Sequence, residues 1–124
     1  MNPTQRAAFH DEIAQAKRHI NNCALQAGLA HLERAHIIGQ ACVVAHVTAH
    51  WWMCVVEWRR RRPTAVLGQL LRILLGAIGS AVGIIPVGNT GASNVSMFKR
   101  MPVEPGLQKI IGAGLVKNQR NQKG

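Results

Sequence analysis

The sequence predicts an all-α fold, a small antiparallel bundle of about four helices followed by a loop-rich C-terminal segment. Three observations support this prediction. Apolar residues recur at helical spacing, and Pro, Gly and Asn residues divide the chain into helix-length segments. The length of 124 residues, 48% of them apolar, suits a single core of three or four helices. We expect one helical domain over residues 1–111 and a flexible basic tail over residues 112–124.

The first two helices are expected to form a hairpin. The segment Asn2-Pro3-Thr4-Gln5 has the pattern of a helix start, with Asn2 as the N-cap and Gln5 as its capping-box partner. Apolar residues then follow at helical spacing to an end near residues 21–22. A second amphipathic helix begins around residues 25–28, and such a pair packs antiparallel.

A turn or kink is expected near residues 39–43. Without it, one helix would run from about residue 27 to 60 and span roughly 50 Å, which is too long for so small a domain. A third helix then continues to the arginine cluster 59–62. One face of this helix carries His46, His50, Met53 and Glu57.

Pro63 opens a fourth helix that is almost wholly apolar from Thr64 to Ile85. Its length would suit a membrane span, but Arg72 lies about a third of the way along it, where a charge is costly in lipid. The sequence therefore favours a core helix that ends in a glycine-rich loop. A helix that contacts lipid over residues 64–85 is the alternative.

The C-terminal third is expected to be irregular. Residues 86–91 form a turn cluster, and the segment through Asn94 is predicted to be an ordered surface loop. The run Gly88-Asn89-Thr90-Gly91 lacks the Lys-Ser/Thr ending of a phosphate loop, so a structural turn is favoured. A short helix is expected near residues 107–111.

The charge and the cysteine content limit which partners and which cellular compartment are expected. The net charge of +10 would suit an anionic partner, but the cations are dispersed between a helix end and the tail, so nucleic acid is not favoured. The odd number of cysteines, three, excludes a full disulfide framework and favours a reducing compartment. The polar start of the chain has no apolar signal segment, so the expected location is the cytoplasm, with inner-membrane association as the alternative.

The histidines carry the strongest chemical signal. Glu33 and His36 are spaced i, i+3, and His46 and His50 are spaced i, i+4, so each pair lies on one helical face. Imidazole is the commonest protein metal ligand, and Met53 could add a soft thioether. The competing interpretation is structural, with His36 bonded to a backbone carbonyl or to Gln40, and the second pair facing the loop after residue 88.

A single site for both pairs requires the chain to reverse near residues 39–43. In a continuous helix, His36 and His50 would lie about 21 Å apart along the axis. A di-iron carboxylate centre is less favoured, because such bundles usually supply four carboxylates and the chain has five acidic residues in all. Asp11 and Glu12 could supply further ligands from the first helix, and His31 could join the site. His10 and His19 are predicted to be surface residues. No spacing suggests nucleophilic catalysis.

Four separated motifs together resemble a known family. They are Leu32-Glu33-Arg34-Ala35-His36-Ile37-Ile38-Gly39-Gln40, His46-x-x-x-His50-Trp51-x-Met53, Gly68-Gln69-x-x-Arg72, and Pro86-Val87-Gly88-Asn89-Thr90-Gly91. In this order they are similar to the small bacterial family catalogued as domain of unknown function 3703, over roughly residues 5–111. The resemblance implies an all-helical fold and a genetic context of heavy-metal resistance. It implies no activity.

The functional expectation is a non-enzymatic protein that binds a transition metal (zinc, copper or iron) in heavy-metal handling. Its predicted ligands are Glu33, His36, His46 and His50, with Met53 as an optional soft ligand. Two alternatives remain open. One is a membrane-associated helical accessory protein. The other is a protein-interaction module in which the histidine cluster is structural, with another protein or a second copy of the chain (a homo-oligomer) as its partner.

Overall fold

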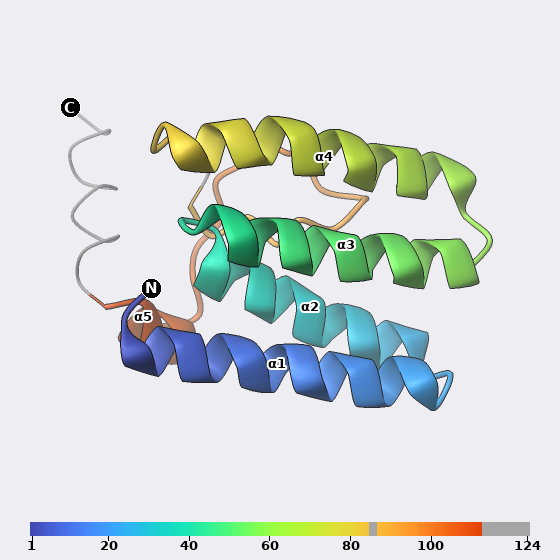
Figure 1. The fold of residues 1–124 in the computed structure, drawn as a ribbon, viewed down its shortest axis with the longest axis horizontal. Coiled ribbons are helices and arrows are strands. Elements are labelled where there is room, and N and C mark those ends of the chain that lie inside the picture. The colour runs from blue at the N-terminus through green and yellow to red at the C-terminus, as the bar shows by residue number, and fades with distance from the viewer. Residues whose placement is uncertain (85–86, 113–124) are drawn as a thin grey trace.

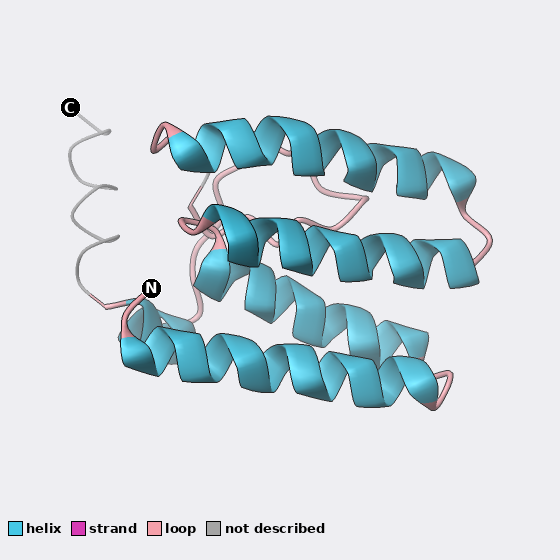
Figure 2. Cartoon of the chain, viewed as in Figure 1, coloured by secondary structure: helices cyan, strands magenta, loops and turns pink. Residues whose placement is uncertain are grey.

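The computed structural model describes residues 1–84 and 87–112, and this part of the chain is helical without strands (Figures 1 and 2). The predicted all-α fold is therefore confirmed. The four long helices and the short fifth one are α1 (Pro3–Asn21), α2 (Leu25–Gly39), α3 (Val43–Arg59), α4 (Pro63–Ala81) and α5 (Pro105–Ile111). The predicted tail over residues 112–124 lies, after Gly112, outside the described residues.

Helices α1 and α2 form the predicted hairpin, which α5 covers at one end (Figure 1). The capping box is present: the backbone N–H of Gln5 donates to Asn2 Oδ1 at 2.8 Å, and the backbone N–H of Asn2 donates to Gln5 Oε1 at 2.9 Å. The two helices approach closely at Gly28, where an added Cβ would lie 2.8 Å from Ile20 Cγ1. Apolar residues from both helices form one side of the hydrophobic core.

The chain reverses where the sequence predicts it, between Gly39 at the end of α2 and Val43 at the start of α3. The reversal is tight, because a Cβ on Gly39 would lie 2.6 Å from Ala45 Cβ and 3.1 Å from the Phe9 ring. Glycine is therefore required here by the close approach of α3 and α1. As a result, α3 runs back along α2 and packs against it.

Helix α4 is shorter and less buried than predicted. It ends at Ala81 rather than near residue 85, and residues 85–86 lie outside the described part of the chain. Among the other described helices it packs only against α3, so it forms one edge of the molecule (Figure 1). The prediction of a core helix holds only for the side that faces α3. Within the described residues, no helix is both long and apolar enough to cross a membrane.

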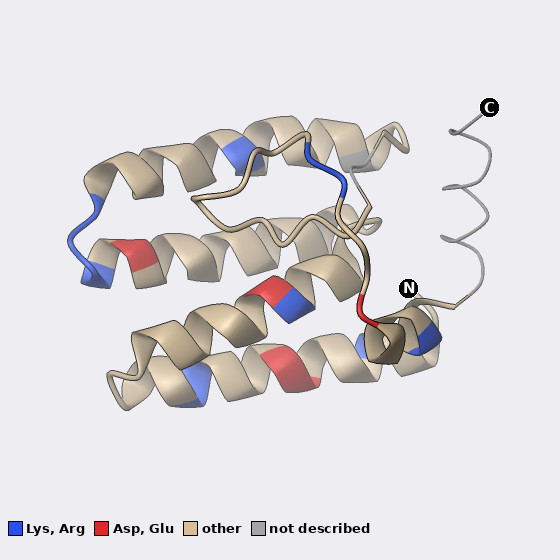
Figure 3. Ribbon diagram, turned by 180° about the vertical axis from the view of Figure 1, so that it is seen from behind, with Lys and Arg blue, Asp and Glu red and all other residues tan. Residues whose placement is uncertain are grey.

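The connection between α4 and α5 is not the surface loop that the sequence predicts. It crosses the side of α3 and α4 that faces the viewer in Figure 3, and its first part, residues 87–92, is mostly buried. Asn89 holds this loop together, because its side-chain amide donates to the carbonyls of Ser96 and Lys99, at 2.8 and 2.6 Å. Its Oδ1 accepts from the backbone N–H of Gly91 at 2.9 Å. These internal bonds satisfy the polar groups that burial would otherwise leave without partners.

Candidate metal centre

Three imidazoles meet inside the molecule, where α2, α3 and the buried loop come together. His36 comes from α2, and His46 and His50 come from consecutive turns of α3. All three are buried, with at most 7% of each residue exposed. Each offers one ring nitrogen, and these nitrogens all lie within 4.8 Å of one another. The ring centroids are 4.5 to 4.9 Å apart.

The reversal at residues 39–43 is what assembles this cluster. His46 and His50 share a face because they are spaced i, i+4 on a helix. His36 continues the buried stripe of α2, and the antiparallel packing of α3 on α2 brings it beside the other two rings. The three histidines therefore form the single cluster that the sequence allows only if the chain turns back.

Two of the imidazoles are oriented by hydrogen bonds on Nδ1. His36 Nδ1 lies 2.8 Å from the carbonyl oxygen of Asn89, which can only accept, so this nitrogen carries the proton. His50 Nδ1 lies 2.6 Å from Gln69 Oε1. The Gln69 amide donates through Nε2 to the Gly91 carbonyl at 3.1 Å, which fixes its oxygen towards His50. In both neutral rings, Nε2 is therefore left with a lone pair.

His46 has the opposite arrangement. Its Nε2 lies 3.5 Å from the carbonyl oxygen of Arg72, at the limit of a hydrogen bond, so Nε2 carries the proton and Nδ1 the lone pair. Two of the three lone-pair nitrogens, His36 Nε2 and His46 Nδ1, are buried without a hydrogen-bond partner. A buried polar atom without a partner is costly and calls for an explanation.

The surroundings keep the three rings neutral. Burial, with repulsion from His50 and His46, lowers the pKa of His36 well below its ordinary value. Burial, with repulsion from His46 and a smaller contribution from Arg72, lowers the pKa of His50 to about 4. Burial also lowers the pKa of His46. Near neutral pH the cluster therefore presents unprotonated imidazoles, the form that binds metal ions.

Two glycines allow backbone to approach the rings. A Cβ on Gly76 of α4 would lie 2.1 Å from His46 Nε2, so no side chain fits there without displacing the ring. A Cβ on Gly91 would lie 3.0 Å from His50 Cε1 and 3.1 Å from His36 Cδ2. Gly91 also has φ +76°, a backbone conformation that glycine adopts at little cost. The α4 helix and the loop thus close the cluster from two sides.

The other predicted ligands stand apart from this cluster. Glu33 is half-buried one turn before His36, burial raises its pKa, and its carboxylate does not join the three nitrogens. Met53 is fully buried one turn after His50 and packs in the hydrophobic core. Glu57, which shares the predicted helical face but is not a predicted ligand, is fully buried further along α3, where it accepts a hydrogen bond from Ser93 Oγ at 2.9 Å.

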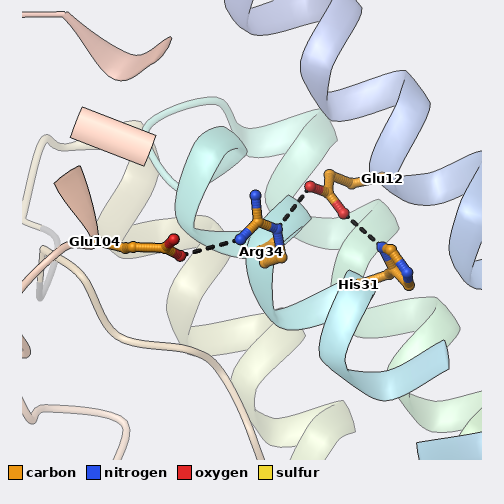
Figure 4. Close-up of polar contacts among 4 residues, drawn as sticks. All are labelled: Glu12, His31, Arg34 and Glu104. Carbon is orange, nitrogen blue, oxygen red and sulfur yellow. Dashed lines mark hydrogen bonds and ion pairs between the residues drawn. The ribbon is translucent and has the colours of Figure 1, made fainter. Parts of the chain in front are cut away.

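His31 and Glu12 also lie outside the cluster, in an ionic network between α1, α2 and the start of α5 (Figure 4). Glu12 bridges His31 Nδ1 and Arg34 Nε, both at 2.7 Å. Arg34 Nη1 extends the network to Glu104 at 3.0 Å. This network ties the helical hairpin to the C-terminal segment, and it uses the α1 carboxylate that the sequence suggested as a possible ligand.

Two residues of the site were not predicted as such from the sequence, Gln69 and Asn89. Gln69 is fully buried on the apolar helix α4, and an amide there needs a polar partner. That isolated amide is the one local signal for its role. Asn89 acts through its backbone carbonyl, and a backbone group leaves no trace in the sequence.

Comparison with known proteins assigns the chain to a family. A family described as a protein of unknown function (DUF3703) matches residues 3–111. The chain belongs to this family. The match confirms the resemblance that the four motifs indicate, and it covers all five helices. No curated protein and no solved structure matches the chain.

The DUF3703 chain meets the chemical requirements for holding a metal ion at this cluster. The donors are three neutral imidazoles, and the Nδ1 bonds of His36 and His50 are the outer contacts that usually orient metal-binding histidines. Nitrogens bound to one zinc ion at about 2.1 Å would lie roughly 3.4 Å apart. Binding would therefore draw the rings together from their present separation, and it would satisfy the two buried lone pairs.

Proposed function

We propose that this protein binds one transition-metal ion through His36, His46 and His50 and serves in metal handling rather than in catalysis. The observation that carries the proposal is the pair of buried imidazole nitrogens without partners, His36 Nε2 and His46 Nδ1, inside a cluster of three neutral rings. A metal ion would supply the missing partner for both. Buried polar atoms without partners are a small minority in native proteins, so two of them inside one cluster call for an explanation.

The donor set narrows the choice of metal. Three imidazoles suit zinc or copper, whereas non-haem iron usually has a carboxylate ligand as well. Three protein ligands leave at least one coordination position for water or for a group on a partner molecule. An open position suits a protein that takes up an ion and passes it on, and heavy-metal handling is the proposed setting.

The sequence also predicts Glu33 and Met53 as ligands, and size-conserving substitutions measure their part. Glu33→Gln removes the negative charge, and Met53→Leu removes the thioether. If the histidines alone hold the ion, neither substitution lowers the bound stoichiometry. A selective loss of copper(I) in Met53→Leu would add the thioether to the ligand set.

The decisive experiment is metal analysis of the full-length, tag-free chain by plasma mass spectrometry after incubation with zinc, copper or iron and desalting. We expect about one equivalent in the parent and less than about a tenth in His50→Ala, as for a site that needs all its ligands. His10→Ala is the matched control, because His10 is exposed on α1 and outside the cluster.

Thermal unfolding of the same samples tests whether the ion binds the folded state. An ion at roughly a thousand times its dissociation constant should add about 4 kcal/mol to the free energy of unfolding. That shift should be absent in His50→Ala. Less than about a tenth of an equivalent in the reconstituted parent, with no shift in melting temperature, would refute the proposal and leave a structural histidine cluster.

A further inference from the structure

The outer face of α4 is apolar from Leu67 to Ile78 and is not covered by the described part of the chain. Six large side chains on it are exposed by 43% to 69%, namely Leu67, Leu70, Leu71, Leu74, Leu75 and Ile78. No exposed residue of α4 is charged, and its one cation, Arg72, turns inward to donate to the carbonyl of Val95 at 2.6 Å. In Figure 3, α4 carries one blue band and no red one, whereas charged residues are marked along α1 and α2 and in the turn between α3 and α4.

The face differs from the outer surface of α1. The exposed positions of α1 include Arg6, His10, Asp11, Lys17 and Arg18, as expected for a helix in water. The six apolar side chains of α4 together present on the order of 600 Å² of surface, at the upper end of what a soluble monomer leaves exposed. All five exposed leucines among the described residues therefore lie on one helix, whereas α3 exposes Val44, Trp51 and Trp58.

The spacing on this face is that of a helix-pairing seam. Leu67, Leu71, Leu74 and Ile78 follow one another at intervals of four, three and four residues, the a/d pattern by which helices pack against each other. The six residues are also arranged symmetrically about a point between Arg72 and Ile73. A second α4 running in the opposite direction about that point would therefore match each of them with another member of the set. Leu67 then faces Ile78, Leu70 faces Leu75, and Leu71 faces Leu74.

Charge selects the direction of pairing. The four arginines 59–62 lie at or just before the N-terminal end of α4, in the turn from α3 (Figure 3). A parallel pair would bring two such clusters together. An antiparallel pair would separate the two helix starts by about 28 Å, several Debye lengths at physiological salt. It would also place each cluster near the negative C-terminal end of the opposite helix.

We propose that the chain forms a two-fold symmetric homodimer in which the α4 helices of two copies pack antiparallel along their exposed leucine faces. Two such faces bury about 1,200 Å², the lower end of the range for specific interfaces. A lipid surface is the less favoured occupant, because helices that lie on membranes carry cations along their polar flanks, and here the cations gather at one end. The dimer does not depend on metal binding.

The test is the mass of the full-length chain in solution, by light scattering coupled to size-exclusion chromatography at micromolar concentrations. We expect twice the chain mass for the parent and a single chain for Leu71→Glu/Leu74→Glu, which sets acidic side chains opposite each other at the centre of the seam. The matched control is Val44→Glu, because Val44 is 75% exposed and lies on α3, outside this face. This substitution should leave the dimer intact. Circular dichroism verifies that each variant keeps its helices.

A charge-reversed partner distinguishes lost pairing from lost folding. Mixing the acidic variant with Leu71→Lys/Leu74→Lys should restore a dimer, because each acidic side chain then faces a basic one. The direction of pairing is tested by disulfide formation between a Leu67→Cys chain and an Ile78→Cys chain. Both carry Cys23→Asn, since Cys23 is exposed and has φ 59°, which asparagine tolerates.

Three results would overturn the proposal. The first is a parent chain that stays monomeric at every concentration. If that monomer floats with phosphatidylglycerol vesicles and the acidic variant does not, the face binds lipid instead. A dimer that persists in the acidic variant uses another surface. Faster disulfide formation between two Leu67→Cys chains than between the mixed pair would refute antiparallel packing.

Discussion

Acidification should destabilise the metal-free fold through the histidine cluster. The pKa of His50 is about 4 in the folded chain and 6.5 when unfolded. Because the folded pKa is the lower one, the unfolded chain binds more protons between these values. Stability is therefore full above pH 6.5 and falls as the pH drops towards 4.

The size of this loss follows from the same two values. Through His50 alone, the free energy of unfolding should be about 1.4 kcal/mol lower at pH 5.5 than at pH 7.5. Burial also lowers the pKa of His36 well below its ordinary value, so this ring destabilises the fold in the same direction as the pH drops. The loss of about 1.4 kcal/mol from His50 alone is a substantial share of the stability of a small domain, which is roughly 5–15 kcal/mol.

Urea unfolding at pH 7.5, 6.5 and 5.5, with a chelator present throughout, measures this loss directly. Substituting His50→Gln should reduce the loss at pH 5.5 by about 1.4 kcal/mol, whereas His10→Gln, at an exposed position, should leave it unchanged. An unfolding free energy in the parent that stays constant over this range would refute the buried, neutral state of the cluster.

Three further predictions, the first with a matched control variant, concern the surroundings of the site and the ionic network between α1 and α2. Gly91→Ala should lower stability by about 1–2 kcal/mol and weaken metal binding, because the new Cβ strains a backbone at φ +76° and presses on the His50 ring. Gly112→Ala is the control, because Gly112 has φ +79° with open space around it, so this substitution should lower only the melting temperature. If Gly91→Ala and Gly112→Ala changed the metal affinity equally, the steric argument would be contradicted. Gln69→Leu removes the acceptor that orients His50, and titration calorimetry should show a metal affinity roughly 10- to 100-fold lower, while an unchanged affinity would mean that the bond does not orient the ring. Glu12→Gln should cost no more than about 1 kcal/mol in urea unfolding, because its partner Arg34 is 41% exposed and solvent weakens the ion pair.

Local patterns in the sequence were enough to predict the helices, apart from the end of α4. The N-cap at Asn2, the start at Pro63 and the turn near Gly39 are set by backbone chemistry within a few neighbouring residues, so they can be predicted without tertiary contacts. The pairing of His46 with His50 follows from helical geometry in the same way. The family match rests on motifs that are visible in the sequence itself.

The tertiary structure decided how these parts combine. Joining His36 to the other two rings depends on the direction in which α3 leaves the turn, and separating Glu33 from them depends on the rotation of α2 about its axis. Burying the loop at Asn89 and leaving α4 uncovered are likewise long-range outcomes. The sequence by itself determined the elements and the chemical groups that they carry, because those depend on residues close along the chain. Which groups meet was decided only by packing, because their contacts join residues far apart in the sequence.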